Sequence, residues 1–550
     1  MRLHLTLSSI AIAATLFAKP AQAQYSWNNL PVVNEPVFRK DTFNILRFGA
    51  KADGLTLNSP SINKAIDACN KKGGGVVLIP AGLWLTGPIV LKSNVELHIS
   101  RDALLQFTTE FDQYPLIETS YEGLAAMRCQ PPVSATDAEN IAITGSGIID
   151  GAGDAWRQVK KDKLTESQWK RLVASGGLTS ADNRTWYPSE KSQKGSSVKL
   201  AGVIDPNKTK ADHEEIKDFL RPNMIVLTRC KKVLLKDVTF QNSPAWCIHP
   251  LLCEHITLRG VTVKNPWYAQ NGDGLDLESC RFGRVENCVF DVGDDAICIK
   301  SGRDEQGRKR GVPTENFIIN GNTVYHAHGG FVIGSEMSGG ARNLFVSNCN
   351  FIGTDIGLRF KTTRGRGGVV EKIFIRDINM TNIPGEAILF DMYYMAKDPV
   401  PLAGEKHADV KVETFPVTEA TPQFRDFHIS NVVCRGAAKG IFIRGLPEMP
   451  ISNIEMDNIV IKAKKGVELL EASNIRLTNA TFEVAESDPL INVRNSREIK
   501  LANIRFEEAK NFISLLGGTS GVSVSGTDVK KAKEKPVFAD GAKTGALIIK

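Results

Sequence analysis

The segment "LLKDVTF", residues 234–240, returns as "TLRGVTV" at 257–263 and as "VENCVF" at 285–290. Each copy has a short run of alternating apolar and polar residues, then a small polar residue or glycine, then a second short run. Alternation with period two is typical of β-strands, because successive side chains of a strand point to opposite faces. The copies therefore predict strands that turn at the small residue, and they exclude helical repeats.

The same pattern continues along the chain, mostly at intervals in the twenties. Its turn residues are Asp237, Gly260, Asn287, Asn322, Asn348, Asp377, Asn431, Asn458, Asn479 and Asn503. The interval of 54 residues between Asp377 and Asn431 corresponds to two coils. Such a period of short strands is typical of a stacked solenoid. We predict an all-β fold, a single-stranded right-handed parallel β-helix with coils about 4.8 Å apart and asparagines bonded along a turn.

A second strand follows each turn, and five of these strands can be aligned. They read "GLDLES" (274–279), "AICIKS" (296–301), "GFVIGS" (330–335), "GLRFKT" (357–362) and "AILFDM" (387–392). Asp273 and Asp295 directly precede the first two, so stacking places them about 5 Å apart, with Asp294 beside them. Three carboxylates on one face repel one another, which raises some pKa values and leaves others low, as acid/base chemistry requires.

Each of these residues also has a simpler interpretation. Asp is common in turns, and "GDGLD" and "VGDDA" each contain a Gly-Asp turn signal. His328, almost in the same register one coil later, resembles a surface histidine when taken alone. Arg359 and Lys361 could be solvated, but their outward position two coils beyond Asp295 favours a cradle for a carboxylate ligand.

The N-terminus reads as a secretory signal over residues 1–23. Arg2 begins it, an apolar run covers 10–17, and Ala21-Gln22-Ala23 form a small-residue cleavage site. No later stretch is long and apolar enough to predict a membrane span. We expect an exported protein, periplasmic in a Gram-negative cell and otherwise secreted, with a lead-in at 24–40.

Composition narrows the expected partners. The formal charge is +7, and it falls to +5 once the signal, with Arg2 and Lys19, is removed. This suits an acidic polymer, but long basic runs are absent, so we expect no nucleic-acid partner. The ten cysteines lack zinc-ligand spacing, and several, such as Cys288, Cys298 and Cys349, occupy strand positions that favour buried thiols. No metal or cofactor is expected.

The motifs together resemble a known family. "NGDG", "GDD", "HGGFVIGS" and "RFK", in this order and about one coil apart, resemble the four signatures of polygalacturonases, glycoside hydrolase family 28, and of its bacterial exo-acting members. "FNILRFGAKADG" (43–54) and "INKAIDAC" (62–69) are similar to the entry strand and capping helix of pectin-lyase-like β-helices. The resemblance covers about residues 41–515.

The resemblance implies roles for the acidic residues. Asp294 would be the general acid, Asp273 and Asp295 would activate water, and His328 would tune the proton of the acid. Hydrolysis would invert the anomeric carbon, for which acid and base usually stand about 6.5–9.5 Å apart. The sequence departs from the family at Gly272, where threonine is usual, and in an added glycine after His328.

The resemblance also implies substrate-binding residues. Arg359 and Lys361 would bind the galacturonate carboxylate. Tyr394 is the best match for the substrate-binding tyrosine, with Tyr393 as the alternative. Asn271 and Lys300 complete the expected binding set. The implied substrate is pectin, polygalacturonate or an oligogalacturonide with α-1,4 linkages.

Segments outside the repeat complete the prediction. Residues 152–222 form a long insertion that could wall the cleft and make cleavage exo, with Trp186 and Tyr187 stacking on sugar. Within it, "TESQ" (165–168) could cap a short helix. A second excursion spans 396–423, the β-helix domain spans 41–517, and 518–550 form a peripheral tail. Two alternatives remain: a polysaccharide lyase on the same scaffold and a noncatalytic β-helix adhesin.

Overall fold

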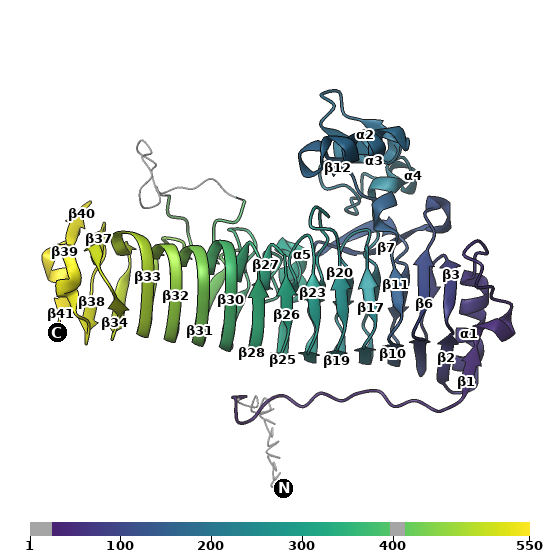
Figure 1. Ribbon diagram of the computed structural model, residues 1–550, viewed down its shortest axis with the longest axis horizontal. Coiled ribbons are helices and arrows are strands. Elements are labelled where there is room, and N and C mark those ends of the chain that lie inside the picture. The colour runs from purple at the N-terminus through teal and green to yellow at the C-terminus, as the bar shows by residue number, and fades with distance from the viewer. Residues whose placement is uncertain (1–24, 396–412) are drawn as a thin grey trace, which may run out of the picture.

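The computed structural model describes residues 25–395 and 413–550, so the predicted signal at 1–23 lies outside the described residues. Parallel strands stack along one axis into an elongated β-helix (Figure 1). The predicted fold class is confirmed. In the described part of the chain, no helix has the length and apolar character needed to cross a membrane.

Three parallel ladders run along the axis. The first contains β1 (Thr42–Asn44), β2 (Gly75–Ile79), β5 (Val95–Ile99), β10 (Glu139–Gly145), β16 (Lys231–Lys236), β19 (Glu254–Arg259), β22 (Arg281–Glu286) and β25 (Thr314–Asn320). The second contains β3 (Gly82–Thr86), β6 (Ala103–Phe107), β11 (Ile148–Asp150), β17 (Thr239–Gln241), β20 (Thr262–Lys264), β23 (Val289–Asp291) and β26 (Thr323–Tyr325). The third contains β4 (Ile89–Val90), β9 (Val133–Thr136), β15 (Ile225–Thr228), β18 (Ile248–Leu251), β21 (Leu275–Glu278), β24 (Ile297–Lys300), β27 (Gly329–Ile333) and β29 (Ile356–Lys361).

Longer strands continue these ladders toward the C-terminus. They are β28 (Ala341–Ile352), β30 (Val369–Asp391), β31 (Gln423–Arg444), β32 (Ile451–Leu470) and β33 (Ala472–Arg494). β30, β31, β32 and β33 each bend through all three ladders.

The third ladder has the register that was predicted from the aligned strands. Leu275 pairs with Ile297, Ile297 with Phe331, and Phe331 with Leu358. All four side chains are fully buried in the core between the ladders. The site residues therefore project from the other face of this ladder.

The turn residues explain the preference for Asn, Asp and Gly. Asn348, Asp377 and Asn431 all have φ between 53° and 57°, a left-handed conformation that these residue types tolerate best. Asn431 Nδ2 donates to Asp377 Oδ1 at 2.8 Å, so the predicted hydrogen bonding along the turn is confirmed here. One prediction is wrong by one residue: Gly321, with φ 69°, takes the turn position, whereas Asn322 points inward and bonds the Cys288 N–H.

The interval of 54 residues is one coil and not two. β30 and β31 pair directly, with Arg376 opposite Ser430 and Ile378 opposite Val432. The extra length is the second excursion, whose residues 396–412 lie outside the described residues.

Both ends of the helix are covered. α1 (Ser59–Lys71) lies over the first coil and buries Ile62, Ala65, Ile66 and Cys69, as expected for a capping helix (Figure 1). At the other end, the residues expected as a peripheral tail continue the coils instead. β38 (Val522–Ser525), β40 (Val537–Ala539) and β41 (Leu547–Ile549) pair in parallel with the strands before them.

The lead-in runs along the outside of the solenoid in Figure 1. The Trp27 ring packs edge-on against Phe345, with 5.3 Å between the ring centroids. The guanidinium of Arg376 lies 3.9 Å from the centroid of the Trp27 ring. The lead-in thus attaches to coils that are distant in sequence.

Two segments project beside the third ladder. One is a hairpin of β7 (Leu116–Tyr121) and β8 (Leu124–Cys129). The other is the insertion, which holds α2 (Glu166–Ala174), α3 (Glu190–Ser196), α4 (Lys210–Glu214) and a small sheet of β12 (Val159–Lys160), β14 (Thr185–Tyr187) and β13 (Leu178–Thr179). Thr165 and Gln168 form a capping box on α2, as "TESQ" predicted.

The ten cysteines are all free and buried, which confirms the expectation of buried thiols.

Candidate active site

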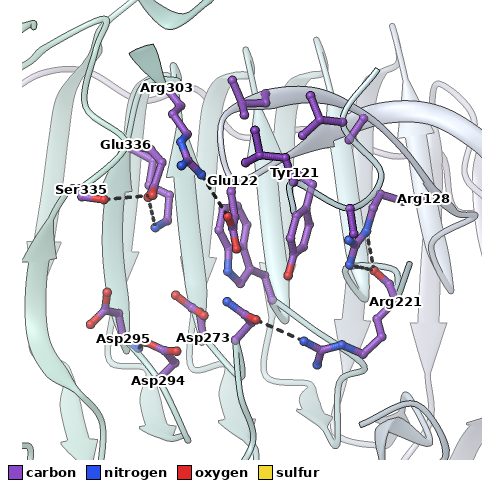
Figure 2. A pocket seen from close by; sticks show the side chains of 18 of the residues that line it. Tyr121, Glu122, Arg128, Arg221, Asp273, Asp294, Asp295, Arg303, Ser335 and Glu336 are labelled. Carbon is purple, nitrogen blue, oxygen red and sulfur yellow. Dashed lines mark hydrogen bonds and ion pairs between the residues drawn. The ribbon is translucent and has the colours of Figure 1, made fainter. Parts of the chain in front are cut away.

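A pocket of about 470 Å³ lies on the outer face of the third ladder, between that ladder, the hairpin and the insertion (Figure 2). Asp273, Asp294 and Asp295 form part of its floor. The Gly274 N–H donates to the Asp295 carbonyl at 2.9 Å, so Asp273 and Asp295 occupy equivalent positions in adjacent coils, as predicted. The β-helix register therefore brings the three carboxylates together.

The carboxylates are closer than expected for an inverting pair. One oxygen from each of Asp273, Asp294 and Asp295 lies within 4.8 Å of the others. The expected separation of about 6.5–9.5 Å describes sites with two carboxylates on opposite sides of a sugar. Here the expected acid, Asp294, and the expected bases share one side of the pocket and lie closer than that range, so the predicted separation is wrong for this site.

Two cations bond Asp295. Lys361 Nζ lies 2.7 Å from Asp295 Oδ2, and Arg359 Nη1 lies 3.2 Å from Oδ1. Burial alone would raise the pKa of Asp295, but Lys361 and Arg359 outweigh it and hold the pKa well below its usual range. Asp295 is therefore a carboxylate at any working pH. We expected Arg359 and Lys361 to be free to bind the carboxylate of a ligand. In the structure both cations already bond Asp295, so that expectation is revised.

Asp273 has the opposite environment. It is buried, and its Oδ1 has no hydrogen-bond partner among the described residues. Burial, reinforced by the nearby charges of Asp276 and Asp294, raises the pKa of Asp273 well above its usual range. The expected division into raised and lowered pKa values thus falls on Asp273 and Asp295.

Asp294 is the most exposed of the three and faces the histidine. His328 Nδ1 lies 3.1 Å from Asp294 Oδ1, and the same oxygen accepts the Asp295 N–H at 3.0 Å. The bond to Asp294 raises the pKa of His328 against the effect of burial. The added glycine puts His328 in register with Asp294, since the His328 N–H donates to the Asp294 carbonyl at 3.0 Å.

The other predicted binding residues also reach the pocket. Tyr394 lies beside the cation pair, with Lys361 Nζ 4.8 Å from its ring centroid, whereas Tyr393 is buried against Arg364 and Arg444. The Oδ1 of Asn271 accepts from Arg221 Nη2 at 3.1 Å. Trp186, expected to stack on sugar, is instead a core residue of the insertion, packed with Val159 and Trp169.

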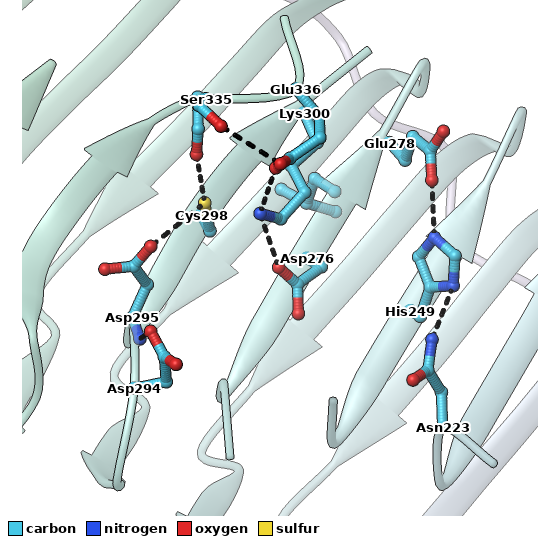
Figure 3. Close-up of polar contacts among 12 residues, drawn as sticks. Asn223, His249, Asp276, Glu278, Asp294, Asp295, Cys298, Lys300, Ser335 and Glu336 are labelled. Atoms are coloured by element: carbon cyan, nitrogen blue, oxygen red, sulfur yellow. Dashed lines mark hydrogen bonds and ion pairs between the residues drawn. The ribbon is translucent and has the colours of Figure 1, made fainter. Parts of the chain in front are cut away.

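A buried charge network lies behind the aspartates, and sequence reasoning missed most of it (Figure 3). Lys300 Nζ donates to Glu336 Oε2 at 2.9 Å and lies 3.6 Å from Asp276 Oδ1. Burial opposes the charge on Glu336, but Lys300 and Arg366 prevail and lower its pKa to about 2. Asp276 had a usable signal, because it takes the outward position within "GLDLES".

A second buried chain supports the pocket wall. His249 Nε2 contacts Glu278 Oε2 at 2.8 Å, and Asn223 Nδ2 contacts His249 Nδ1 at 3.1 Å (Figure 3). The His249 ring packs edge-on against Trp246 at 5.1 Å. This chain orients Trp246, whose ring lies 4.7 Å from Lys300 Nζ in the pocket.

The hairpin crosses from the early coils to the turn after β24. Glu122 pairs with Arg303 at 3.2 Å, the Arg303 N–H donates to the Gly123 carbonyl at 3.2 Å, and the Ala125 N–H donates to Gln306 at 2.9 Å. Behind it, the Met127 N–H donates to the Gly202 carbonyl of the insertion at 2.7 Å. Side chains of the hairpin, such as Tyr121 and Arg128, and of the insertion, such as Phe219 and Arg221, together line one end of the pocket (Figure 2).

The three aspartates are also the group whose oxygens could surround a metal ion. Their charges are already compensated by Lys361, Arg359 and His328, and the pKa of Asp273 favours its neutral form. The donor set therefore suits proton transfer better than metal binding.

Comparison with known proteins agrees with this geometry. Residues 205–445 match the sequence model of glycosyl hydrolases family 28. A probable polygalacturonase from Vitis vinifera is 30% identical over 441 residues, which are 78% of this chain and 76% of that protein. An exo-poly-alpha-D-galacturonosidase from Dickeya chrysanthemi is 27% identical over 458 residues, 80% of this chain and 70% of that protein.

A solved structure extends the match to three dimensions. The hyperthermoactive exopolygalacturonase from Thermotoga maritima superposes with a TM-score of 0.63 and 33% identity, covering 82% of this chain and 92% of that one. The register of Asp273, Asp294 and Asp295, the sequence relatives and this superposition lead to one assignment. The chain belongs to glycosyl hydrolases family 28, as its four motifs predicted.

Proposed function

We propose that this protein hydrolyses the α-1,4-galacturonosyl linkages of pectin, polygalacturonate or oligogalacturonides. The observation that carries the proposal is the trio of carboxyl groups in one pocket lined by cations, with the pKa of Asp273 raised and that of Asp295 lowered. Asp295 is thereby favoured as the ionised base, while Asp273 is favoured in its protonated form beside it, so the two can hold one water between them. The relatives named above act on galacturonan, which agrees with the acidic substrate.

In the proposed reaction, one water attacks the anomeric carbon directly. Asp295 accepts a proton from the water, and the protonated Asp273 donates a hydrogen bond to the same water. As the new C–O bond forms, the glycosidic C–O bond breaks and Asp294 donates its proton to the leaving oxygen. After each turnover Asp295 releases its proton to solvent, and His328, bonded to Asp294, takes up a proton from solvent and passes it to Asp294.

The spacing of the carboxyl groups supports this arrangement. A water that bonds two carboxyl oxygens at about 2.7 Å each holds them at most about 5.4 Å apart. The oxygens of Asp273 and Asp295 lie within 4.8 Å, which suits such a bridge. Direct attack by water inverts the anomeric centre, and proton NMR of the first product would show the β-anomer. An α-anomer would require a covalent intermediate instead.

We further propose that cleavage is exo, from the non-reducing end. The hairpin and the insertion line one end of the pocket and are bonded to each other there, an arrangement that would stop a long chain from passing through. The test follows viscosity and reducing ends together on polygalacturonate. Slow thinning with one early mono- or disaccharide is expected, whereas a steep viscosity fall with mixed oligomers would show endo cleavage.

One variant separates hydrolysis from the alternatives. Asp294→Asn should abolish turnover with nearly unchanged folding, because the amide keeps the shape but cannot supply the proton. Unchanged activity in the folded variant would remove Asp294 as the acid. Products of the wild type that absorb in the ultraviolet would indicate a lyase, and binding without products would indicate an adhesin.

Export is also part of the proposal. Residues 1–23 have the order of a signal, so the mature protein would act in the periplasm of a Gram-negative cell or outside the cell. N-terminal sequencing of the protein from its host should begin at Gln24. A start at Met1 would contradict export through this signal.

A further inference from the structure

Two arginines at the end of the pocket lined by the hairpin and the insertion lack an acidic partner among the described residues. Six cationic side chains line the pocket: Arg128, Arg221, Lys300, Arg303, Lys361 and Arg366. Lys300 and Arg366 lie near Glu336, Arg303 pairs with Glu122, and Lys361 pairs with Asp295. Arg128 and Arg221 form no ion pair with any residue in the described ranges, 25–395 and 413–550.

Both arginines are buried, with 4% and 8% of their surface exposed. An arginine cannot lose its charge, and a buried charge without a counter-ion is costly. The two also lie together, since Arg128 Nε donates to the Arg221 carbonyl at 2.9 Å. Two adjacent cations without a counter-ion make this end of the pocket favourable for an anionic group of a ligand.

The guanidinium groups are held in place but not saturated. Arg221 Nη1 donates to the carbonyls of Pro244 at 2.7 Å and Gln270 at 3.1 Å. The guanidinium of Arg128 lies 3.5 Å from the ring centroid of Tyr121, which in turn stacks on Trp246. No residue of the described structure accepts a hydrogen bond from Arg128 Nη1. Figure 2 shows both side chains at one end of the pocket, with Arg221 directed toward the Asp273 side.

We propose that Arg128 and Arg221 form a carboxylate-binding subsite for the uronate ring that enters this end of the pocket. This rests on the proposed function, because in the proposed exo cleavage this end holds the non-reducing terminal region of the chain. Arg221 bonds Asn271, two residues before Asp273, so the subsite adjoins the point of cleavage. Lys361 and Arg359 lie on the other side of Asp273 and Asp295 and would face the other side of the scissile bond. The enzyme therefore reads the charge of a sugar on each side of the bond.

The hairpin supplies Arg128 and the insertion supplies Arg221, so the proposed subsite is built from both of these segments. A neutral ring in this position, such as a methyl-esterified galacturonate, would leave both arginines buried and unpaired. Selection against it follows from the desolvation cost. The subsite thus makes the esterification of the terminal residues a specificity determinant.

The test uses two trigalacturonates, one fully acidic and one esterified only on its non-reducing terminal ring. The wild type should prefer the acidic trimer in kcat/KM by about 10- to 100-fold, the effect of a charge-assisted hydrogen bond. Arg128→Gln and Arg221→Gln should each reduce this preference severalfold, mainly by slowing the acidic trimer. Arg128→Lys should restore part of it. Equal rates on both trimers in the wild type would overturn the subsite.

The control is Arg157→Gln. Arg157 is a buried arginine of the same insertion that lies outside the pocket lining and pairs with Asp154. Arg157→Gln should leave the preference for the acidic trimer unchanged. If it reduced that preference as much as Arg128→Gln does, the effect would come from folding of the insertion and the subsite would be overturned. Where an arginine variant does not fold, calorimetric binding of galacturonate and its methyl ester to the wild type decides instead, and equal affinity overturns the subsite. If the wild type hydrolyses neither trimer, the proposed function fails, while the same calorimetry still tests the subsite.

Discussion

Replacing Lys361 by alanine should damage stability as well as turnover. Lys361 Nζ lies 2.7 Å from Asp295 Oδ2, and both side chains are almost fully buried. Removing one partner of a buried pair costs about 3 kcal/mol or more, because the other charge stays buried. Arg359, at 3.2 Å from Asp295, retains part of the compensation, so we expect about 3 kcal/mol.

The expected shift in melting temperature follows from the length of the chain. The entropy of unfolding is about 2.1 cal/mol/K per residue, which gives roughly 1 kcal/mol/K for a chain of this size. The loss therefore corresponds to a fall in Tm of about 3 °C at pH 7. The kcat/KM on trigalacturonate should fall at least about tenfold, because the carboxylate of Asp295 becomes less favoured and less well positioned.

The pH dependence distinguishes this pair from a general packing effect. The folded pKa of Asp295 lies below its unfolded value, so its stabilisation is present above about pH 4 and is lost as the pH falls through the folded pKa. The Tm difference between wild type and Lys361→Ala should therefore shrink below pH 4. Differential scanning calorimetry between pH 2.5 and 7 measures it.

Lys464→Ala provides the matched control. Lys464 pairs with Glu486 at 3.2 Å, but both side chains are exposed, and such pairs contribute less than about 1 kcal/mol. A buried pair is refuted if Lys361→Ala lowers Tm at pH 7 by no more than Lys464→Ala does. It is also refuted if the fall in Tm caused by Lys361→Ala is the same at all pH values.

Three other substitutions test separate parts of the structure. Asp273→Asn should raise Tm, and more at pH 7 than at pH 4. The folded pKa of Asp273 lies above its unfolded value, so the wild type loses about 1.4 kcal/mol of stability for each pH unit between the two pKa values. A lower Tm of the variant at pH 7 would contradict this. His328→Gln should lower Tm most below about pH 6.5 and progressively less as the pH rises through the raised pKa of His328, and a deficit independent of pH would argue against the pair with Asp294. Trp27→Ala should cost about 2 kcal/mol in urea unfolding by uncovering Phe345, with kcat/KM unchanged, and unaltered stability would show that the lead-in does not clamp the coils.

The sequence alone determined the coils and the register of Asp273, Asp294 and Asp295. Strand alternation and left-handed turns depend on neighbouring residues, so their pattern is visible in the chain at a constant period. The same local chemistry explains the error at Asn322, because "NGN" offers three residues that suit the turn and Gly321 takes it. The predicted end of the repeat at Gly517 is too early, because the strands of the last coils, such as β35 (Arg505–Phe506) and β40 (Val537–Ala539), are too short for their alternation to be recognised.

Only the tertiary structure decided how the site is closed and how its charges are paired. Arg128 and Arg221 belong to a hairpin and an insertion that have no period, so no alignment places them beside Asp273. Lys361 reaches Asp295 across two coils, and its partner depends on burial and distance, which the order of residues does not contain. Register is a local property repeated at every coil, whereas electrostatic pairing depends on which segments fold over the ladder.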